Sequence, residues 1–384
     1  MRQSFISSRI LFIYITFLII YSSLQFILIL RHKTSYLSDS LFYKHLYHQF
    51  QGDNFNDAYQ KVIHKLDISR ATQIDWNIFY NENQYRDTLQ YFSKRPLYPF
   101  FAYLINSVFN NELLAFTIPI FVAYIGLIIT IFILFKQGLN YFFASFGTFL
   151  FVSFYPFLDL STYFLTDTIG AFFWMLQVGF LFKFIQKGSR KWIVLFTIML
   201  AISLTNREQS ILLLPMQIAL SIIFYKLKMN HFLHASVKIT MISAVIVFCY
   251  LLISILQGNK TLWDTIHYTM NNYGYFDNTY SVTETLSYLF KQVYLLHTVF
   301  VRDLISHHIW SLISTFSIVG TVIALKKITL INTTFILSGL ASYSFVFLFP
   351  ELSYRYYFPV IISICYFCSY FLSHLVNLST KGRD

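Results

Sequence analysis

Apolar stretches about as long as a bilayer is thick recur along this 384-residue chain, and they constrain its fold more than any other feature. The first of them, Ile10–Leu30, contains no charged residue. A helix needs about 20 predominantly apolar residues to cross the hydrocarbon core, where every backbone polar group must be satisfied internally. Charged residues make up only 12% of the chain, against roughly 25% in soluble domains. The sequence therefore predicts an all-α polytopic membrane protein.

We expect about ten transmembrane helices within one membrane domain that spans residues 1–384. The predicted crossings are Ile10–Leu30, Leu113–Phe135, Tyr141–Pro156, Asp167–Gln186, Trp192–Thr205, Ser210–Leu227, Val237–Gln257, Leu304–Leu325, Thr329–Phe349 and Tyr356–His374. The shorter apolar segment Leu97–Phe109 is interpreted as a half-buried or interfacial helix. Because Ile10–Leu30 is followed by Arg31-His32-Lys33 rather than by small residues, we interpret it as an uncleaved anchor.

The distribution of charge predicts the orientation of the chain. With the N-terminus in the cytoplasm, the inner segments hold 14 of the 28 Lys and Arg residues and a single acid, Asp384. Short basic loops on one side are the positive-inside pattern, which places both termini in the cytoplasm. The net charge of +11 forms no basic stripe on a soluble module, so we expect no nucleic-acid partner. The richness in Phe, Ile, Tyr, Lys and Asn is typical of an AT-rich bacterial genome, which predicts the cytoplasmic (inner) membrane of a bacterium.

Two polar segments, 31–99 and 258–302, are expected on the extracytoplasmic side. The first should carry short amphipathic helices over residues 31–95, and Ser38-Asp39-Ser40 opens one of them. Charges kept near a membrane are costly and therefore mark functional candidates. Four places on the predicted outer side carry such charges: Asp39, the loop Asp159–Asp167, Asn206-Arg207-Glu208 and Arg355. We expect an extracytoplasmic site built from these loop ends.

Five short motifs follow one another along the predicted outer side. They are Asp39 with Tyr43, then Arg95-Pro96-Leu97-Tyr98-Pro99, Leu165-Thr166-Asp167, Thr205-Asn206-Arg207-Glu208 before Leu213-Leu214-Pro215, and Arg355-Tyr356 before Pro359. In this order the sequence resembles the integral-membrane glycosyltransferases of the GT-C fold, in particular the branch shared by protein O-mannosyltransferases and lipid A aminoarabinose transferases. One position departs from the family, because Ser40 follows Asp39 where many members carry a second acid. That departure leaves divalent-metal use and the identity of the base open.

The resemblance implies an inverting transfer of a sugar from a polyprenyl-phosphate donor to a glycan, lipid or protein acceptor at the bilayer. Asp39 would be the base, and Asp167 would orient the acceptor or help hold a cation. The substrate-binding candidates are Tyr43, Lys94, Arg95, Arg207, Arg355 and Tyr356, with Arg207 first for the lipid phosphate because guanidinium binds phosphate bidentately. Each residue also has a structural interpretation. Asp39 and Asp167 suit helix starts, and an Arg beside a membrane can anchor to headgroups or pair with a loop acid.

Other chemistries have weaker support. His45 and His48 have metal-compatible spacing on one helix, but no clear third ligand accompanies them. An O-antigen or polysaccharide polymerase would be expected to carry its main Arg-rich loop later in the chain. A lipid or sugar transporter would be expected to have Gly/Pro-broken helices in matching halves, whereas this chain has 12 Gly and 7 Pro. We retain both as alternatives to the glycosyltransferase.

Overall fold

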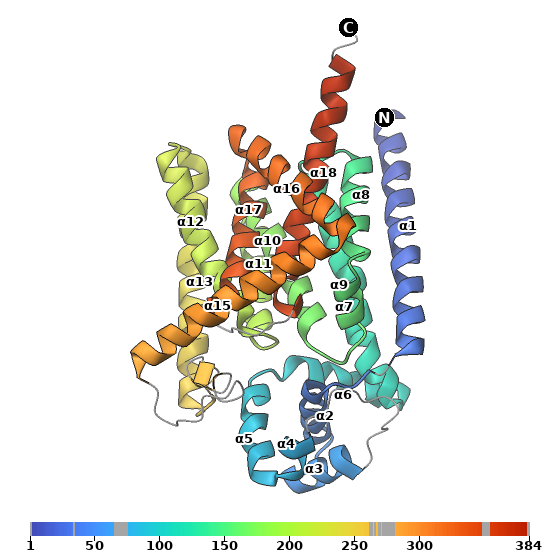
Figure 1. The fold of residues 1–384 in the computed structure, drawn as a ribbon, viewed down its shortest axis with the longest axis vertical. Helices are drawn as coiled ribbons and strands as arrows, with labels where there is room; N and C mark the ends of the chain where they lie inside the picture. Colours follow the sequence, from blue (N-terminus) through green and yellow to red (C-terminus); the bar gives the residue numbers. More distant parts are fainter. Residues whose placement is uncertain are drawn as a thin grey trace.

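The computed structural model describes residues 2–33, 35–64, 76–260, 264, 266–267, 270, 281–347 and 354–381, and nearly all of them are helical (Figure 1). The α-helices are α1 (Arg2–His32), α2 (Ser38–Phe50), α3 (Phe55–His64), α4 (Trp76–Tyr80), α5 (Glu82–Ser93), α6 (Leu97–Phe109), α7 (Glu112–Phe135), α8 (Tyr141–Val152), α9 (Tyr155–Leu160), α10 (Asp167–Lys187), α11 (Arg190–Leu204), α12 (Leu213–Lys226), α13 (Asn230–Leu256), α15 (Val282–Ser306), α16 (His308–Lys326), α17 (Leu330–Tyr343) and α18 (Phe358–Lys381). Three 3-10 turns, η2 (Glu208–Leu212), η3 (Ser344–Phe347) and η4 (Tyr354–Tyr356), join some of them.

Each of the ten predicted crossings coincides with a helix, but these helices differ in length. Among the described residues, seven segments are long and apolar enough to cross a membrane: α1, α7, α10, η2 with α12, α13, α16 and α18. The helices α8, α11 and α17 have only 12, 15 and 14 residues. At 1.5 Å per residue they reach roughly 18–23 Å, less than the roughly 30 Å of a hydrocarbon core. Seven crossings are therefore supported by length and composition, and the predicted total of ten stays a prediction.

The outer helices of the bundle present apolar side chains to their surroundings. On α1, Phe12 and Ile13 are 71% and 64% exposed, and on α13 Leu256 is 76% exposed. Such faces suit lipid rather than water, so the chain is a multi-pass membrane protein. The start of α1 and the end of α18 lie at the same end of the bundle (Figure 1).

A small layer of helices, α2–α5, packs at the other end of the bundle (Figure 1). These are the short helices predicted for residues 31–95. Aromatic stacking holds them together: the ring of Phe42 lies 5.1 Å from Phe79, 5.0 Å from Tyr85 and 4.6 Å from Phe92, centroid to centroid. Offset aromatic pairs at such distances add to the hydrophobic gain of burying each ring. This layer fixes the start of α2, where Asp39 lies.

The polar segment 258–302 contains a long helix that continues beyond it. α15 crosses the face of the bundle shown in Figure 1 and ends at Ser306, so the crossing predicted to start at Leu304 begins four residues later, at His308. Its apolar side chains Val282 and Phe290 are 65% and 68% exposed, whereas its polar Thr285 is fully buried. An apolar outer face is typical of a helix that lies in a membrane interface.

Backbone contact between α16 and α18 depends on Gly320. A Cβ at this position would overlap the backbone carbonyl oxygen of Phe367, which cannot rotate away. We therefore expect Gly320→Ala to force the two helices apart and to destabilise the protein by about 1–3 kcal/mol, the usual cost of overpacking. Thermal unfolding in detergent measures this. Gly179→Ala is the control, because a Cβ there meets Leu134 at an ordinary 3.5 Å; equal loss in both variants would contradict the explanation.

Candidate active site

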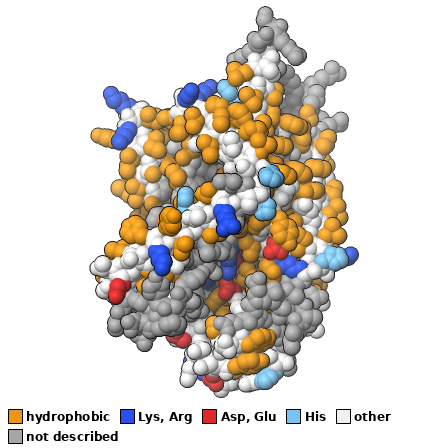
Figure 2. Space-filling view, viewed as in Figure 1, with side chains coloured by type: hydrophobic (Ala, Val, Ile, Leu, Met, Phe, Trp, Pro, Cys, Tyr) orange, Lys and Arg blue, Asp and Glu red, His pale blue; other side chains and the backbone are white. Residues whose placement is uncertain are grey.

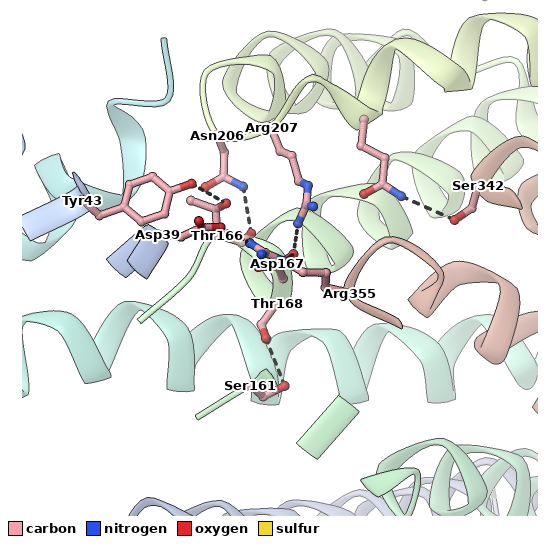
Figure 3. Close-up of polar contacts among 11 residues, drawn as sticks. Asp39, Tyr43, Ser161, Thr166, Asp167, Thr168, Asn206, Arg207, Ser342 and Arg355 are labelled. Atoms are coloured by element: carbon pink, nitrogen blue, oxygen red, sulfur yellow. Dashed lines mark hydrogen bonds and ion pairs between the residues drawn. The ribbon is translucent and has the colours of Figure 1, made fainter. Parts of the chain in front are cut away.

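Asp167, the first residue of α10, is the centre of a buried ion-pair network (Figure 3). Its side chain has no exposed surface, and its Oδ1 accepts from both Arg207 Nη1 and Arg355 Nε, the latter at 3.0 Å. Its other oxygen, Oδ2, is buried without a hydrogen-bond partner among the described residues. Two guanidinium groups therefore converge on one carboxylate, from segments that lie 40 and 188 positions away in the sequence.

Arg355 extends this network to Asp39. Its Nη2 donates to Asp39 Oδ2 at 2.8 Å, while its Nε donates to Asp167. The Asp39 side chain is 32% exposed and that of Arg355 is 13% exposed, so the network runs from a buried acid to an accessible one. Acidic and basic side chains lie together in Figure 2 below α15, where the bundle meets the small helices. We call the four residues Asp39, Arg355, Asp167 and Arg207 the ion-pair chain.

The start of α2 presents Asp39 to the network. The helix is capped by Leu37, whose N–H donates to Ser40 Oγ at 3.1 Å, so neither Ser38 nor Asp39 is the N-cap that the sequence suggested. The helix therefore starts with Ser38 already in its first turn, and the Ser40 hydroxyl accepts from the backbone N–H of the N-cap residue. Asp39 remains in the first turn, where a negative side chain interacts favourably with the helix dipole. Its side chain is thereby left to bind Arg355.

Arg355 lies in a short 3-10 segment and Arg207 lies directly before one, so neither belongs to a long helix. Arg355 is the middle residue of η4, and Arg207 precedes η2, which leads directly into α12. Irregular backbone at the end of a bundle lets a side chain turn inward instead of following a helix face. Each guanidinium is thus aimed at the start of α10, and Asp167 serves as an ion-pair partner rather than only as a helix start.

Tyr43, a predicted substrate-binding residue, contacts Thr166, the residue before Asp167, rather than the ion-pair chain itself. It is fully buried, and its hydroxyl hydrogen-bonds to Thr166 Oγ1 at 3.0 Å. Asn206 donates to the backbone oxygen of Thr166 at 3.3 Å, and its own Oδ1 has no partner among the described residues. Thr166 is held from both sides, which fixes the position of Asp167 (Figure 3). Neither Thr166 nor Asn206 is predicted as a site residue from the sequence, although each is adjacent in the chain to one that is.

Lys94 forms a second ion pair next to the ion-pair chain. Its ammonium lies 2.9 Å from Glu208 Oε1 and donates to the backbone oxygen of Lys260 at 3.0 Å. Burial lowers the pKa of Lys94, and the negative charge of Glu208 partly offsets that effect. Since Glu208 follows Arg207 directly, Lys94 joins the same end of the bundle. Neighbouring Arg95 has its guanidinium 5.9 Å from the centre of the Phe92 ring.

A double-mutant comparison tests whether Lys94 and Glu208 act as a pair. Lys94→Met leaves Glu208 without its partner in a half-buried setting, so we expect a destabilisation of about 3 kcal/mol. Adding Glu208→Gln removes the stranded charge and should restore part of that stability, as seen in thermal unfolding. If the two single losses simply add in the double variant, the side chains are not energetically coupled.

Two further predictions concern His45, His48 and Tyr356. His45 is buried between the rings of Phe55 and Tyr85, and this burial lowers its pKa to about 4. His48 Nδ1 instead lies 3.0 Å from Gln51 Oε1. No group of three His, Cys, Asp or Glu side chains that could hold a metal ion occurs in the part of the chain that the structure describes. The side chain of Tyr356 lies outside the described residues.

Comparisons with known proteins bear on the family and the fold. The family model for dolichyl-phosphate-mannose-protein mannosyltransferases matches residues 93–252, less than half of the chain. The archaeal oligosaccharyltransferase AglB from Archaeoglobus fulgidus, solved with an inhibitory peptide and a dolichol-phosphate, is similar in structure with a TM-score of 0.50. This chain has the GT-C fold. The match to AglB has 12% sequence identity and covers 75% of this chain and 43% of the AglB chain. No curated protein matches the sequence.

These findings confirm the predicted resemblance to the GT-C membrane glycosyltransferases and support a glycosyltransferase. The matched family segment contains Lys94, Asp167 and Arg207, whereas Asp39 and Arg355 lie outside it. The ion-pair chain thus joins residues inside the matched segment to residues near both ends of the protein. The GT-C fold of this chain brings together a set of charges that the family segment alone does not contain.

Proposed function

We propose that this GT-C chain transfers a sugar from a polyprenyl-phosphate-linked donor to an acceptor hydroxyl or amine. The observation that carries the proposal is the ion-pair chain Asp39–Arg355–Asp167–Arg207, built at one end of a membrane-embedded bundle. A donor with a polyprenyl tail stays in the bilayer, so its phosphate meets the protein at such an end. The family match to dolichyl-phosphate-mannose-protein mannosyltransferases and the fold shared with AglB support the same donor class.

Asp39 is the proposed general base. Its Oδ2 is bound by Arg355, and its Oδ1 has no hydrogen bond to another described residue, so Oδ1 is the oxygen that would receive the acceptor proton. The acceptor oxygen or nitrogen attacks the anomeric carbon from the side opposite the phosphate. The bond between that carbon and the phosphate oxygen breaks, and its electron pair leaves with the polyprenyl phosphate. A single displacement of this kind inverts the configuration at the anomeric carbon.

The departing phosphate needs cations, and the site offers three near one another. Arg355, Arg207 and Lys94 are each held in place by a carboxylate, from Asp39 and Asp167 or from Glu208. Preorganised cations stabilise developing charge without having to reorient during the reaction. Tyr43 acts behind them, because its hydrogen bond to Thr166 fixes the start of α10. Lys94 and Arg95 lie where the first loop returns to the bundle and would meet the phosphate from that side.

The site is proposed to face away from the cytoplasm. Both termini lie at the opposite end of the bundle (Figure 1), and the short loops at that end carry the basic residues expected on the cytoplasmic side. A lipid-linked donor suits this placement because nucleotide sugars are made in the cytoplasm. Cysteine labelling of Asp57→Cys and Lys228→Cys variants in intact cells tests the orientation: an impermeant thiol reagent should label only the former.

Reconstitution tests the proposed activity directly. The purified chain in liposomes should consume polyprenyl-phosphate mannose, or another sugar on the same carrier, and release polyprenyl phosphate in the presence of an acceptor peptide, glycan or lipid A. A nucleotide sugar should not replace the lipid-linked donor. Consumption of the nucleotide sugar alone, or movement of intact lipid-linked sugar across the bilayer without cleavage, would contradict the proposal.

A further inference from the structure

A cavity of about 560 Å³ lies at the end of the bundle that is remote from the ion-pair chain. It is lined by residues of α16, α18 and the turn between α7 and α8: Gly138, Ile323, Lys326, Lys327, Tyr370, Ser373, His374, Asn377 and Leu378. Phe358 begins α18 beside Arg355, and His374 follows it by 16 residues. At 1.5 Å per residue the cavity is therefore about 24 Å along the helix from the proposed active site, close to the thickness of a bilayer core.

The charge of the cavity wall has one sign. Lys326 and Lys327 end α16, His374 faces them from α18, and none of the lining residues is acidic. Tyr370 and Ser373 add hydroxyl groups to the same wall. In Figure 2, blue side chains and no red ones lie along the upper end of the face that is drawn, around the ends of the long helices. The cavity is thus suited to an anion.

Two glycines mark close helix packing beside this cavity. A Cβ at Gly138 would overlap the hydroxyl of Tyr366, which is already committed to Asn332 Oδ1 at 2.8 Å. On α16, Gly320 holds the backbone against Phe367 one turn before Ile323, the first residue of this helix to line the cavity. The helices beside the cavity are therefore closely packed at both glycines.

Exposed apolar side chains adjoin the cavity on the lipid-facing side. Val322 and Leu325 of α16 are 51% and 55% exposed, and Leu375 of α18 is 45% exposed. A small soluble anion would gain nothing from them. A phospholipid would place its headgroup among the lysines and its acyl chains along these residues. The basic cavity wall and the apolar side chains beside it therefore match the two parts of one ligand.

We propose that this cavity binds the phosphate headgroup of an anionic phospholipid in the leaflet opposite the active site. Lys326 and Lys327 bind the phosphate, while Tyr370, Ser373 and His374 offer hydrogen-bonding groups to its remaining oxygens. Basic pockets between membrane helices are known headgroup sites for anionic lipids. This site is independent of the proposed transfer reaction.

Retention of lipid by the purified full chain tests the site. The protein is mixed with phosphatidylglycerol or with phosphatidylcholine in mild detergent, and bound lipid is measured by native mass spectrometry. Phosphatidylglycerol should be retained and phosphatidylcholine should not. Each lysine near an anionic headgroup contributes roughly fivefold to affinity, so Lys326→Gln with Lys327→Gln should weaken phosphatidylglycerol binding roughly 25-fold.

Two further variants separate the cavity from general surface charge. Lys226→Gln with Lys228→Gln removes the same charge at the same end of the bundle, outside the cavity, and should leave binding unchanged. Ser373→Trp fills the cavity but keeps both lysines, and it should also abolish retention while the protein remains folded by size-exclusion chromatography. Equal loss in the Lys226/Lys228 variant, retention in the Ser373→Trp variant, or displacement of the lipid by millimolar inorganic phosphate would each overturn the proposal.

Discussion

The Asp39→Asn variant is expected to transfer sugar about 100- to 10,000-fold more slowly than the wild-type protein, the range that a positioned general base contributes. Asparagine keeps an oxygen that can accept from Arg355, so the ion-pair chain loses charge but not shape. The side chain is 32% exposed and its carboxylate belongs to the accessible end of the network, so the cost in stability should stay below about 1 kcal/mol. The rate of polyprenyl-phosphate release from a reconstituted lipid-linked donor measures the effect.

Asp57→Asn is the matched control for this substitution. Asp57 is an exposed acid on α3, in the same layer of small helices, and its carboxylate accepts from Asn54 rather than from a cation. The control should retain wild-type transfer. Full activity of Asp39→Asn would show that another group accepts the proton, whereas equal loss in both variants would point to damage to the layer rather than to the base.

The sequence predicted the helical segments well, because long apolar runs have few alternatives in a bilayer. It also predicted which charged residues lie at the ends of those segments. It could not predict the partners: Arg355 binds Asp39 across 316 positions of sequence, and that pairing depends on how α18 and α2 are placed by the packing of the whole bundle. The same holds for Lys94, whose partner Glu208 was noted only as the neighbour of Arg207.

Helix α15 shows a second limit of prediction from the sequence. Its apolar residues recur every four positions at Val282, Leu286, Phe290 and Tyr294, which is a helical period. The sequence predicts residues 258–302 only as a polar extracytoplasmic segment, because charged and amide residues interrupt the apolar run and lower its mean hydropathy. Periodicity would have identified the helix, but only the packing shows that the apolar face is the exposed one. Hydropathy alone therefore cannot separate an interfacial helix from a loop.

Asp167→Asn is expected to reduce both stability and transfer, in contrast to Asp39→Asn. The carboxylate is fully buried and accepts from Arg207 and Arg355, so the substitution removes the negative charge that pairs with Arg207, whose side chain is only 4% exposed. Breaking a buried pair by removing one partner costs about 3–5 kcal/mol, which thermal unfolding in detergent will show. Transfer should fall strongly even at temperatures where the variant is folded, because a neutral amide oxygen binds the two guanidinium groups more weakly than the carboxylate that orients them.

Asp159→Asn distinguishes the buried network from a less buried ion pair nearby. Asp159 Oδ1 lies 2.8 Å from Lys33 Nζ, its side chain is 27% exposed, and it lies on α9, in the segment that leads to Asp167. Its loss should cost less than the loss of Asp167, because the Asp159 carboxylate is 27% exposed whereas that of Asp167 is fully buried, and it should leave transfer unchanged. If Asp167→Asn lowered thermal stability and sugar transfer no more than Asp159→Asn does, Arg207 and Arg355 would be held by other contacts. The carboxylate of Asp167 would then not be the group that organises the cations of the proposed active site.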